Sequence, residues 1–522
     1  MGGQLKGKNG AVGAGRKGSE EAGRTILEQG GNAVDAGVAV VLALSVTDWD
    51  EFCFGGEVPI LIHMAERKDV VCVNGQGPAP GKATLEAFEG MDTIPGSGIL
   101  PAAIPGALGA CILALDRFGT RTFREVARPA MELLSLSDKE WTPRLARTLN
   151  RLSDAEKERG KRDRKTGLEA VRHAFYEGSV AEDLVRWNQE EGGLFTLEDM
   201  ANHGARIEEP VHGTYRGYDV YKCGFWTQGP VMVQALNILE LFDVGDMDPE
   251  SPSFIHWTVE ALKLAFADRD TYYGDPYHVD VPAEELLSKS YAEMRAKLIH
   301  PKKASLEHLP GDPASGRPVL EKRVLPAGAF GESRDTTTCV AADQWGNAFV
   351  ATPSGWGSGV NPGTTGVMLG TRLQSFNVWE GHPNCIAPGK LPRITLTPTL
   401  ILKDGSLFSI VSVAGGDQQE QTALQMVLHM IDHGMSAQEA ADSLRFGTNH
   451  LVGSFRQTPL RAGSLALGEP EDLSVVEELK DMGHRLKIKE KMPSRTVLIL
   501  RDKDHALFPG GDLDKDRHLA VL

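Results

Sequence analysis

The sequence lacks the motifs of several common enzyme classes. It contains no GxSxG nucleophile elbow, no HExxH pair and no Cys/His ligand cluster, so a serine hydrolase or a zinc enzyme has no motif support. Only six of its 522 residues are cysteines, and no two form a CxxC pair. Scattered cysteines predict reduced, mostly buried thiols with no disulfide required. They are Cys53, Cys72, Cys111, Cys223, Cys339 and Cys385.

Positive charge and long apolar runs are also scarce. Lys and Arg total 55 against 71 Asp and Glu, and the formal charge of -16 argues against nucleic acid or an acidic membrane as partner. The most apolar run, Ala33 to Val46, is too short to span a bilayer and contains Asp35. The first residues, MGGQLKGKNG, lack the apolar region of a secretory signal. We therefore expect a cytoplasmic protein with no membrane or nucleic-acid partner.

The composition that remains is that of a globular protein, 41% hydrophobic and 24% charged, in one large domain or two ordinary ones. Apolar periodicity predicts helices at 19–29 (capped by Ser19), 33–46, 108–116, 123–134, 231–242, 254–266, 420–433 and 437–444. Alternating apolar residues predict strands at 59–64, 70–73, 338–342, 348–352, 399–402 and 408–413. The mixed-charge run 151–165 indicates a solvated helix or loop, and 301–333 an exposed, mobile connection.

The run Thr336-Thr337-Thr338 after this connection is the most informative feature of the chain. A threonine hydroxyl is a poor nucleophile unless a base lies beside it. Cleavage between Asp335 and Thr336 would free an α-amino group, with a reference pKa of about 8, that can be this base. The alternative is that three β-branched residues only begin a strand. An exposed segment before Thr336 and strands after it favour a processing site, because the new terminus would stay anchored.

Two glycine-containing segments further along could complete such a site. Ser354 opens the segment SGWGSG, where it could hydrogen-bond the nucleophile or belong to an ordinary hairpin-type turn. Gly415 and Gly416 lie between an apolar strand and a helix, so their N–H groups could stabilise an oxyanion. The same pair could equally serve only a tight turn that needs positive φ.

These motifs, with several others in the same order, resemble the γ-glutamyltranspeptidase family of N-terminal-nucleophile hydrolases. The resemblance covers most of the chain. The matching segments are 30–36 (GGNAVDA), 215–218 (YRGY), 234–240 (QALNILE), 267–269 (ADR), 274–276 (GDP), 336–347, 388–398, 415–416 and 424–427 (LQMV).

The resemblance implies an α+β fold, a four-layer αββα sandwich with two central sheets between helical layers. It also implies a precursor that cleaves itself before the nucleophile and stays together as two subunits. The large subunit would be residues 1–335, ending in a pre-cleavage segment of about 301–335, and the small subunit residues 336–522.

The resemblance also implies roles for single residues. Thr336 matches the nucleophile, which attacks an amide carbonyl to form an acyl-enzyme while its own α-amino group acts as base. Ser354 falls where the family places a threonine that supports the nucleophile. Gly415 and Gly416 match the oxyanion-hole pair, and Asp335 would end the large subunit.

The residues that would grip a γ-glutamyl group differ from the family pattern. Gln76 stands where the family has an arginine for the α-carboxylate, and Ser375 where it has an acid for the α-amino group. A pair of supporting serines becomes Ile394 and Thr395. The asparagine of the glycine-rich loop is lost in a short deletion around Gly355.

New cations lie near these positions in sequence, namely Arg372, Lys390 and Arg393. An arginine fork suits a carboxylate, although these arginines could instead pair with structural acids such as Asp417. Trp356 could wall the substrate pocket or only cover it.

We therefore predict a self-processing threonine amidohydrolase acting on a small carboxylate-bearing or acyl amide other than ordinary glutathione. The alternatives are a true γ-glutamyl hydrolase or transferase (a glutathione hydrolase) and a catalytically silent binding homologue. No cofactor or metal is expected. The expected partners are the amide substrate and the two subunits, with a dimer of such pairs left open. The predicted substrate-binding residues are Gln76, Trp356, Arg372, Ser375, Arg393 and Thr395.

Overall fold

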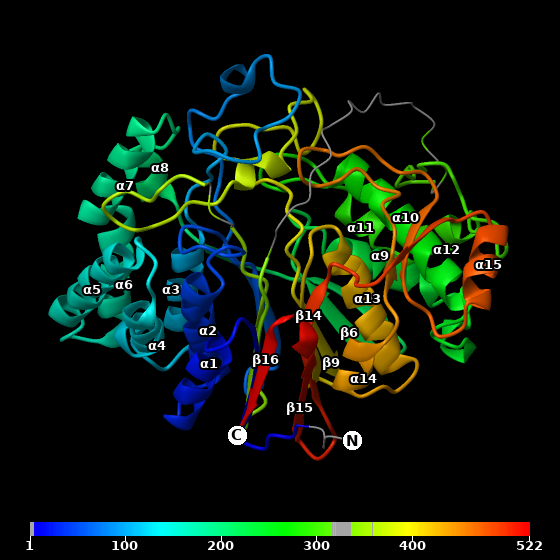
Figure 1. Ribbon diagram of the computed structural model, residues 1–522, viewed down its shortest axis with the longest axis horizontal. Coiled ribbons are helices and arrows are strands. Elements are labelled where there is room, and N and C mark those ends of the chain that lie inside the picture. Colours follow the sequence, from blue (N-terminus) through cyan, green and yellow to red (C-terminus); the bar gives the residue numbers. More distant parts are fainter. Residues whose placement is uncertain (1–4, 316, 318, 320–335, 356, 358) are drawn as a thin grey trace.

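The computed structural model describes residues 5–315, 317, 319, 336–355, 357 and 359–522. Two antiparallel sheets pack face to face in its centre, and helices cover both outer faces (Figure 1). In that view helices α1 to α8 lie on the left and α9 to α15 on the right. The predicted four-layer αββα sandwich is thereby confirmed.

The first sheet combines strands from before and after the predicted cleavage point. Its strand β7 lies between β1 and β8, with Val12 opposite Ala341 and Val340 opposite Val350. All of β7 is buried because both faces of the sheet are covered. In spatial order the strands are β16 (Arg517–Val521), β1 (Gly10–Gly15), β7 (Cys339–Asp343), β8 (Ala348–Ala351), β2 (Ile60–Met64), β3 (Asp69–Asn74) and β4 (Arg206–Glu208).

The second sheet packs against the first and is tied to it by one hydroxyl. Ser412 Oγ donates to Ala351 O at 2.7 Å and accepts from Cys339 N at 3.4 Å. The strands in spatial order are β15 (Leu507–Gly511), β14 (Arg495–Arg501), β10 (Ser406–Ala414), β9 (Thr399–Lys403), β6 (Tyr218–Lys222) and β5 (Val211–Tyr215). A small third sheet contains β11 (Phe446–Gly447), β12 (Ser464–Gly468) and β13 (Arg485–Lys489).

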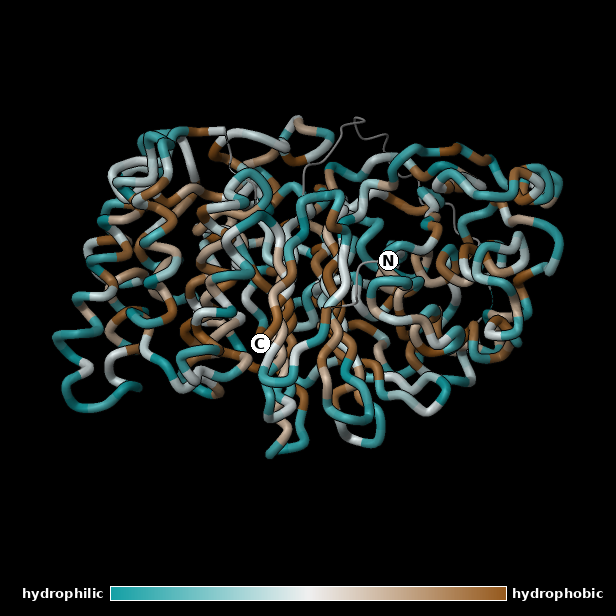
Figure 2. The backbone as a smooth tube through the Cα atoms, turned by 60° about the horizontal axis from the view of Figure 1, so that its bottom comes forward, coloured by the Kyte–Doolittle hydropathy of each residue, from teal (hydrophilic) through white to brown (hydrophobic). Residues whose placement is uncertain are grey.

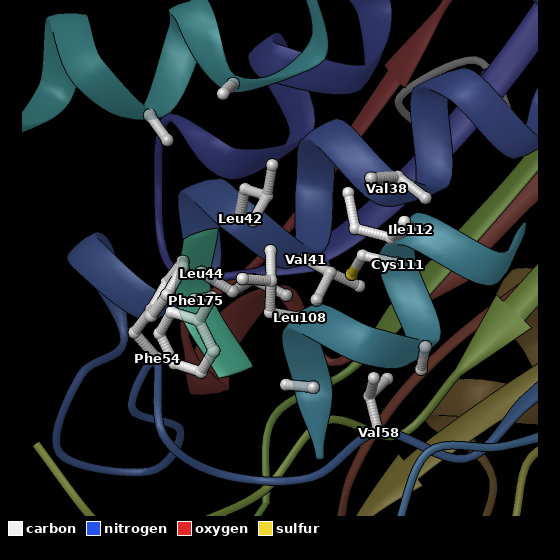
Figure 3. Close-up of a cluster of buried hydrophobic side chains, with 14 of the residues drawn as sticks. Val38, Val41, Leu42, Leu44, Phe54, Val58, Leu108, Cys111, Ile112 and Phe175 are labelled. Atoms are coloured by element: carbon white, nitrogen blue, oxygen red, sulfur yellow. The ribbon is translucent and has the colours of Figure 1, made fainter. Parts of the chain in front are cut away.

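The first helical layer is centred on α2, which packs on β7 and β8. Its apolar sequence is explained by burial, since only Thr47 at its end is not buried. Figure 3 shows Val38, Val41 and Leu42 facing Leu108 and Ile112 of α3. The helices of this layer are α1 (Ser19–Glu28), α2 (Ala33–Thr47), α3 (Ala107–Phe118), α4 (Phe123–Leu136), α5 (Thr142–Arg159), α6 (Arg164–Tyr176), α7 (Ser179–Glu190) and α8 (Leu197–Asn202).

The second helical layer covers the other sheet, with α13 packed on β10. Hydrophobic residues, coloured brown in Figure 2, concentrate in the sheets and in the helices that pack on them. The helices are α9 (Pro230–Leu239), α10 (Pro252–Tyr272), α11 (Ala283–Leu286), α12 (Lys289–Ala296), α13 (Gln418–Ile431), α14 (Ala437–Asp442) and α15 (Ser474–Asp481). Short 3₁₀ turns are η1 (Glu86–Phe88), η2 (Val244–Asp246), η3 (Arg372–Ser375) and η4 (Leu513–Lys515).

Every helix and strand predicted from periodicity is present, with shifted ends, and all six cysteines are buried and unpaired as predicted. The predicted helix cap Ser19 is wrong: Gly18 caps α1 with a φ of 99°, and Ser19 Oγ hydrogen-bonds Thr47 Oγ1. The run 151–165 falls in α5 and α6 and is not wholly solvated, because Glu156 is buried and accepts from two backbone N–H groups. No helix in the described ranges is long and apolar enough to cross a membrane.

The described beginning of the predicted pre-cleavage segment is held against the body of the protein. Lys263 of α10 donates to Ser305 O at 2.7 Å, and Gly311 N donates to Asp268 Oδ1 at 2.8 Å. Ala304 N adds a bond to Met482 O at 2.7 Å. These contacts anchor this part of the segment, although Lys302, Lys303 and Glu307 in it are exposed as predicted. Its mobility stays a prediction, and residues 320–335 lie outside the described residues.

Candidate active site

Thr336 lies three residues before the start of β7, and its side chain is fully buried. Its φ angle is 70°, which is an outlier for a β-branched residue and costs about 1–3 kcal/mol. Two contacts hold this backbone. Arg495 Nη2 donates to Thr336 O at 3.2 Å, and Thr337 N donates to Pro353 O at 2.9 Å. The strained conformation is thus fixed by the surrounding structure.

The Thr336 hydroxyl lies between two polar side chains. Its Oγ1 donates to Ser354 Oγ at 3.4 Å and accepts from Gln419 Nε2 at 3.1 Å. Gln419 Nε2 also reaches Thr395 Oγ1 at 3.4 Å. The structure therefore brings the predicted nucleophile together with Ser354 directly and with Thr395 through Gln419.

Ser354 is held by a buried ion pair. Its backbone N–H and C=O pair with those of Glu57, both at 3.0 Å, in an isolated bridge rather than a hairpin turn. Arg372 Nη2 donates to Ser354 Oγ at 2.7 Å, while Arg372 Nε donates to Glu57 Oε1 at 2.5 Å. Arg372, predicted to bind substrate, thus orients the Ser354 hydroxyl that contacts Thr336 Oγ1.

The turn between β10 and α13 contains the predicted oxyanion pair. Gly415 has a φ of 134° and Gly416 a φ of 58°, and a Cβ on Gly415 would meet Ser494 Cα at 3.0 Å. The carbonyl of Gly416 accepts from Gln419 N at 3.0 Å, which starts α13. The glycines therefore serve the tight turn, and the turn places them at the positive N-terminal end of a helix.

A buried charge cluster lies behind this turn. Gln228 Nε2 donates to Thr395 O at 3.0 Å and to Gly416 O at 3.3 Å, and its Oε1 accepts from Arg269 Nη1 at 3.0 Å. Arg269 in turn binds Asp417 at 2.6 Å and Asp270 at 2.7 Å. This cluster fixes the turn through its contacts with Gly416 O and Asp417.

Arg393 belongs to the same cluster. Its Nη1 lies 3.4 Å from Asp270 Oδ1, and its Nη2 donates at 3.1 Å to Ser454 Oγ, which itself donates to Asp417 Oδ1 at 2.6 Å. Burial, with Arg269 nearby, lowers the pKa of Arg393 to about 10. Burial would raise the pKa of Asp270, but Arg269 holds it well below its usual value. Arg393 therefore interacts with structural acids, the alternative that the sequence left open.

Ser375 and Lys390 lie on segments that flank Arg393. Asn384 Nδ2 donates to Ser375 O at 2.7 Å, and Asn384 Oδ1 accepts from Arg393 N at 2.8 Å. The Ser375 hydroxyl is buried and has no hydrogen-bond partner among the described residues. Lys390 Nζ donates to Cys385 O at 2.9 Å. Lys390 is thus engaged by the backbone, whereas Ser375 keeps bonding capacity.

Gln76 is buried, and neither atom of its side-chain amide has a partner in the described part of the chain. It lines a cavity of about 410 Å³ whose described lining does not include Thr336. The polar residues around this cavity include Asn74, Arg206, Asp275 and His278. The predicted residues Trp356 and Asp335 lie outside the described residues.

No sequence motif points to four residues that the structure brings to the site. They are Glu57, Gln228, Gln419 and Arg495. Gln419 carried the only usable signal, because it follows the glycine pair by three residues and lies in the first turn of a helix. The other three reach the site from segments far away in sequence.

One group of side chains in the described ranges has the spacing of metal ligands: His256, Glu260 and His484. His256 Nδ1 and His484 Nε2 share a hydrogen bond at 2.9 Å, and Glu260 forms an ion pair with Lys263. Burial lowers the pKa of His484 to about 3, so that the ring is neutral. The Lys263 ammonium already provides a cation for Glu260, whereas His484 Nδ1 is buried with no hydrogen-bond partner in the described part of the chain.

The four-layer sandwich, with a buried threonine at the start of a central strand, defines the class of N-terminal-nucleophile hydrolases. The γ-glutamyltranspeptidase family model matches residues 19–136 and 134–522, and the chain belongs to this family. A glutathione hydrolase proenzyme from Escherichia coli (strain K12) is 30% identical over 97% of this chain and 91% of its own length.

Two solved structures are similar over almost the whole chain. The structure of LmbA2991T421A has a TM-score of 0.89 and 32% identity, and the match covers 99% of both chains. Cephalosporin acylase from Bacillus halodurans has a TM-score of 0.84 and 26% identity, with 100% of this chain and 97% of that chain covered.

Proposed function

We propose that this chain is a self-processing amidohydrolase that uses Thr336 as its nucleophile. The observation that carries the proposal is the Thr336 hydroxyl, buried between Ser354 and Gln419 at the N-terminal end of α13. The family match and relatives named glutathione hydrolase proenzyme and cephalosporin acylase support acyl transfer from an amide. They also support a precursor that is cleaved into two subunits.

Self-cleavage begins with attack of Thr336 Oγ1 on the carbonyl carbon that precedes it. The peptide C–N bond breaks, an ester forms at Oγ1, and the hydroxyl proton goes to the released α-amino nitrogen. Water then hydrolyses the ester and leaves subunits 1–335 and 336–522. The φ of 70° at Thr336 supports this step. The φ torsion is defined through the carbonyl carbon of the preceding residue, and cleavage detaches that carbon from the Thr336 nitrogen and so releases the strain.

Turnover repeats the chemistry on an external amide. The α-amino group of Thr336 takes the hydroxyl proton as Oγ1 attacks the substrate carbonyl and then gives it to the leaving amine. Backbone N–H groups at Gly415 and Gly416 stabilise the oxyanion. Water, deprotonated by the same amine, attacks the ester, and the carboxylic acid leaves as Oγ1 recovers its proton.

The charges near the site favour an acyl group without the amino-acid head of glutathione. Arg372 is bound to Glu57 and Arg393 to Asp270, so both arginines considered for a substrate carboxylate already contact acids. The neutral polar atoms of Gln76 and Ser375 have unused bonding capacity instead. Buried polar groups of this kind are normally hydrogen-bonded, which supports a small polar acyl amide as the substrate.

The first test is a denaturing gel with intact mass on freshly purified protein. Wild type should give chains of 335 and 187 residues, about 36 and 20 kDa by proportion of 56.5 kDa. Thr336→Ala should stay as one chain, because no hydroxyl remains to attack. A single 56.5 kDa band in wild type would favour a silent binding homologue instead.

The second test separates the two substrate classes. Processed wild type is offered glutathione, a γ-glutamyl anilide and a matched butyryl anilide, which lacks only the α-amino and α-carboxylate groups. We expect the highest kcat/KM with the butyryl compound. Efficient turnover of glutathione would support the glutathione hydrolase alternative and contradict the narrower substrate.

A further inference from the structure

We propose that Gln419 is a catalytic residue whose side-chain amide stabilises negative charge on Thr336 Oγ1. This inference rests on the proposed function of Thr336 and adds a residue that the family resemblance did not assign a role. Gln419 touches the reacting oxygen itself, with Nε2 3.1 Å from Oγ1. It is fully buried, so water does not compete for this bond.

The position of Gln419 is fixed from both ends. Its backbone N–H donates to Gly416 O at 3.0 Å, within the turn that carries the oxyanion pair. Its side-chain Nε2 also lies 3.4 Å from Thr395 Oγ1, and Gln228 Nε2 donates to Thr395 O at 3.0 Å. The oxyanion turn and the donor to Oγ1 are therefore parts of one rigid unit at the start of α13.

The Gln419 amide also sets the direction of the nucleophile's proton. An oxygen that accepts from Gln419 is free to direct its own proton to Ser354 Oγ, at 3.4 Å. Ser354 Oγ accepts from Arg372, which can only donate. The proton is thus held on the Ser354 side of the oxygen, and the lone pairs on the other side remain available for attack.

The donor acts where charge on Oγ1 is largest. When the acyl-enzyme forms, the O–H bond breaks and the C–O bond is made. When water attacks the ester, the electron pair of the C–O bond returns to Oγ1 before the α-ammonium proton reaches it. An N–H aimed at this oxygen stabilises the charge in both steps, and self-cleavage uses the same oxygen.

The test compares Gln419→Met with Gln421→Met. Both residues are buried on α13, and both variants lose an amide of the same size. In the contacts described for it, the side-chain amide of Gln421 bonds to backbone atoms of Asp417 and Thr448. We expect Gln419→Met to slow self-cleavage about tenfold or more, with little change in Tm. The effect should stay below the roughly hundredfold to thousandfold loss of rate that removal of an oxyanion-hole donor causes. Gln421→Met should lower Tm and cleave within about twofold of the wild-type rate.

The variant Gln419→Glu supplies a signature that a purely structural role would not give. A protonated carboxyl can donate to Oγ1, whereas a carboxylate cannot. Its self-cleavage rate should therefore rise as pH falls toward the pKa of the introduced acid. The wild-type precursor should show no such rise, because the Gln419 amide does not titrate and the Thr336 nitrogen is still part of a peptide bond.

Two results would overturn this role for Gln419: wild-type cleavage rates in Gln419→Met, or equal slowing in Gln421→Met. A wild type that remains in one piece would instead remove the proposed function, and the role of Gln419 with it. The two failures are distinguishable because self-cleavage of wild type is measured first and needs no external substrate.

Discussion

At the scale of single residues, the proposed nucleophile depends on an ion pair that it does not touch. Arg372 binds Glu57 at 2.5 Å and Ser354 Oγ at 2.7 Å, and both charged side chains are buried. Removing one partner of a buried pair leaves an uncompensated charge, which costs about 3–5 kcal/mol. The Glu57–Arg372 pair therefore links the stability of this region to the orientation of Ser354.

We predict that Arg372→Met destabilises the protein by about 3–5 kcal/mol because Glu57 is left buried without its cation. The double variant Glu57→Gln, Arg372→Met should be more stable than the single variant. Both are measured by urea unfolding in the uncleaved Thr336→Ala background, so that one chain unfolds. Equal stability of the single and double variants would contradict this coupling.

The residues closest to the reaction were predictable only in part. Thr336, Ser354, Gly415 and Gly416 follow motifs, and their segments lie together in the fold. Gln419 could not be assigned from the sequence, since its contact with Thr336 depends on how α13 sits on the sheets. Tertiary placement of a helix is not encoded in local periodicity.

At the scale of elements, the start of α13 depends on the backbone of its glycines. Gly415 has a φ of 134°, a conformation that side chains rarely adopt, and a Cβ there would meet Ser494 Cα at 3.0 Å. Gly416 has a φ of 58°, in the left-handed region that other residues can enter at moderate cost. The two glycines therefore differ in how replaceable they are.

We predict that Gly415→Ala lowers Tm and slows self-cleavage more than Gly416→Ala does. The expected extra cost for Gly415→Ala is about 1–3 kcal/mol of backbone strain, with the close contact added. Thermal unfolding of both variants and a cleavage time course check this. A reversed order would mean that the turn does not hold the oxyanion groups as described.

A second feature of α13 is a buried ion pair between Glu420 and Lys222 of β6, at 3.2 Å. Burial raises the pKa of Glu420 to about 7, although Lys222 opposes this shift. The folded protein therefore binds the Glu420 proton more tightly than the unfolded chain, whose carboxyl titrates near 4.5. Stability from this group is present below pH 4.5 and is lost as pH rises to about 7.

We predict that Glu420→Gln removes this loss of folding stability with rising pH. The free energy of unfolding of the wild-type sequence minus that of the variant should fall as pH rises from about 5 to 7. Urea unfolding at several pH values, again in the Thr336→Ala background, measures the difference. A difference that is constant over this range would mean that Glu420 titrates normally.

Elements with strong periodicity were predicted well, and those without it were not. The buried helix α2 and the strand β10 were predicted because their sequences are mainly apolar. The first strand, β1, consists of GAVGAG and has no alternation, because it is covered on both faces and lies between two neighbouring strands. The N-terminal cap of α1 was missed because Gly18 caps the helix by its backbone conformation rather than by a side chain.

At the scale of the whole molecule, both sheets combine residues from each side of Thr336. In the first sheet β7 and β8 lie between β1 and β2, and in the second β9 pairs with β6. Cleavage before Thr336 would therefore break one peptide bond and leave every strand pairing in place. The two subunits would remain joined by backbone hydrogen bonds and by shared hydrophobic cores.

We predict that the cleaved chains elute together in gel filtration and separate only in denaturant. A chain of residues 336–522 expressed alone should lack the tertiary near-UV circular dichroism of the intact protein, because β7 and β9 lose their partners from the large subunit. Coexpression with residues 1–335 should restore that signal. A folded, monomeric 336–522 chain would contradict the shared-sheet description.

The shared sheets have a further consequence for how the protein is made. A single translation product supplies both parts, and their strands already pair in common sheets before the peptide bond breaks. Each large chain is therefore synthesised together with its own small chain. The one-to-one ratio then requires neither association of separately folded chains nor matched expression of two genes.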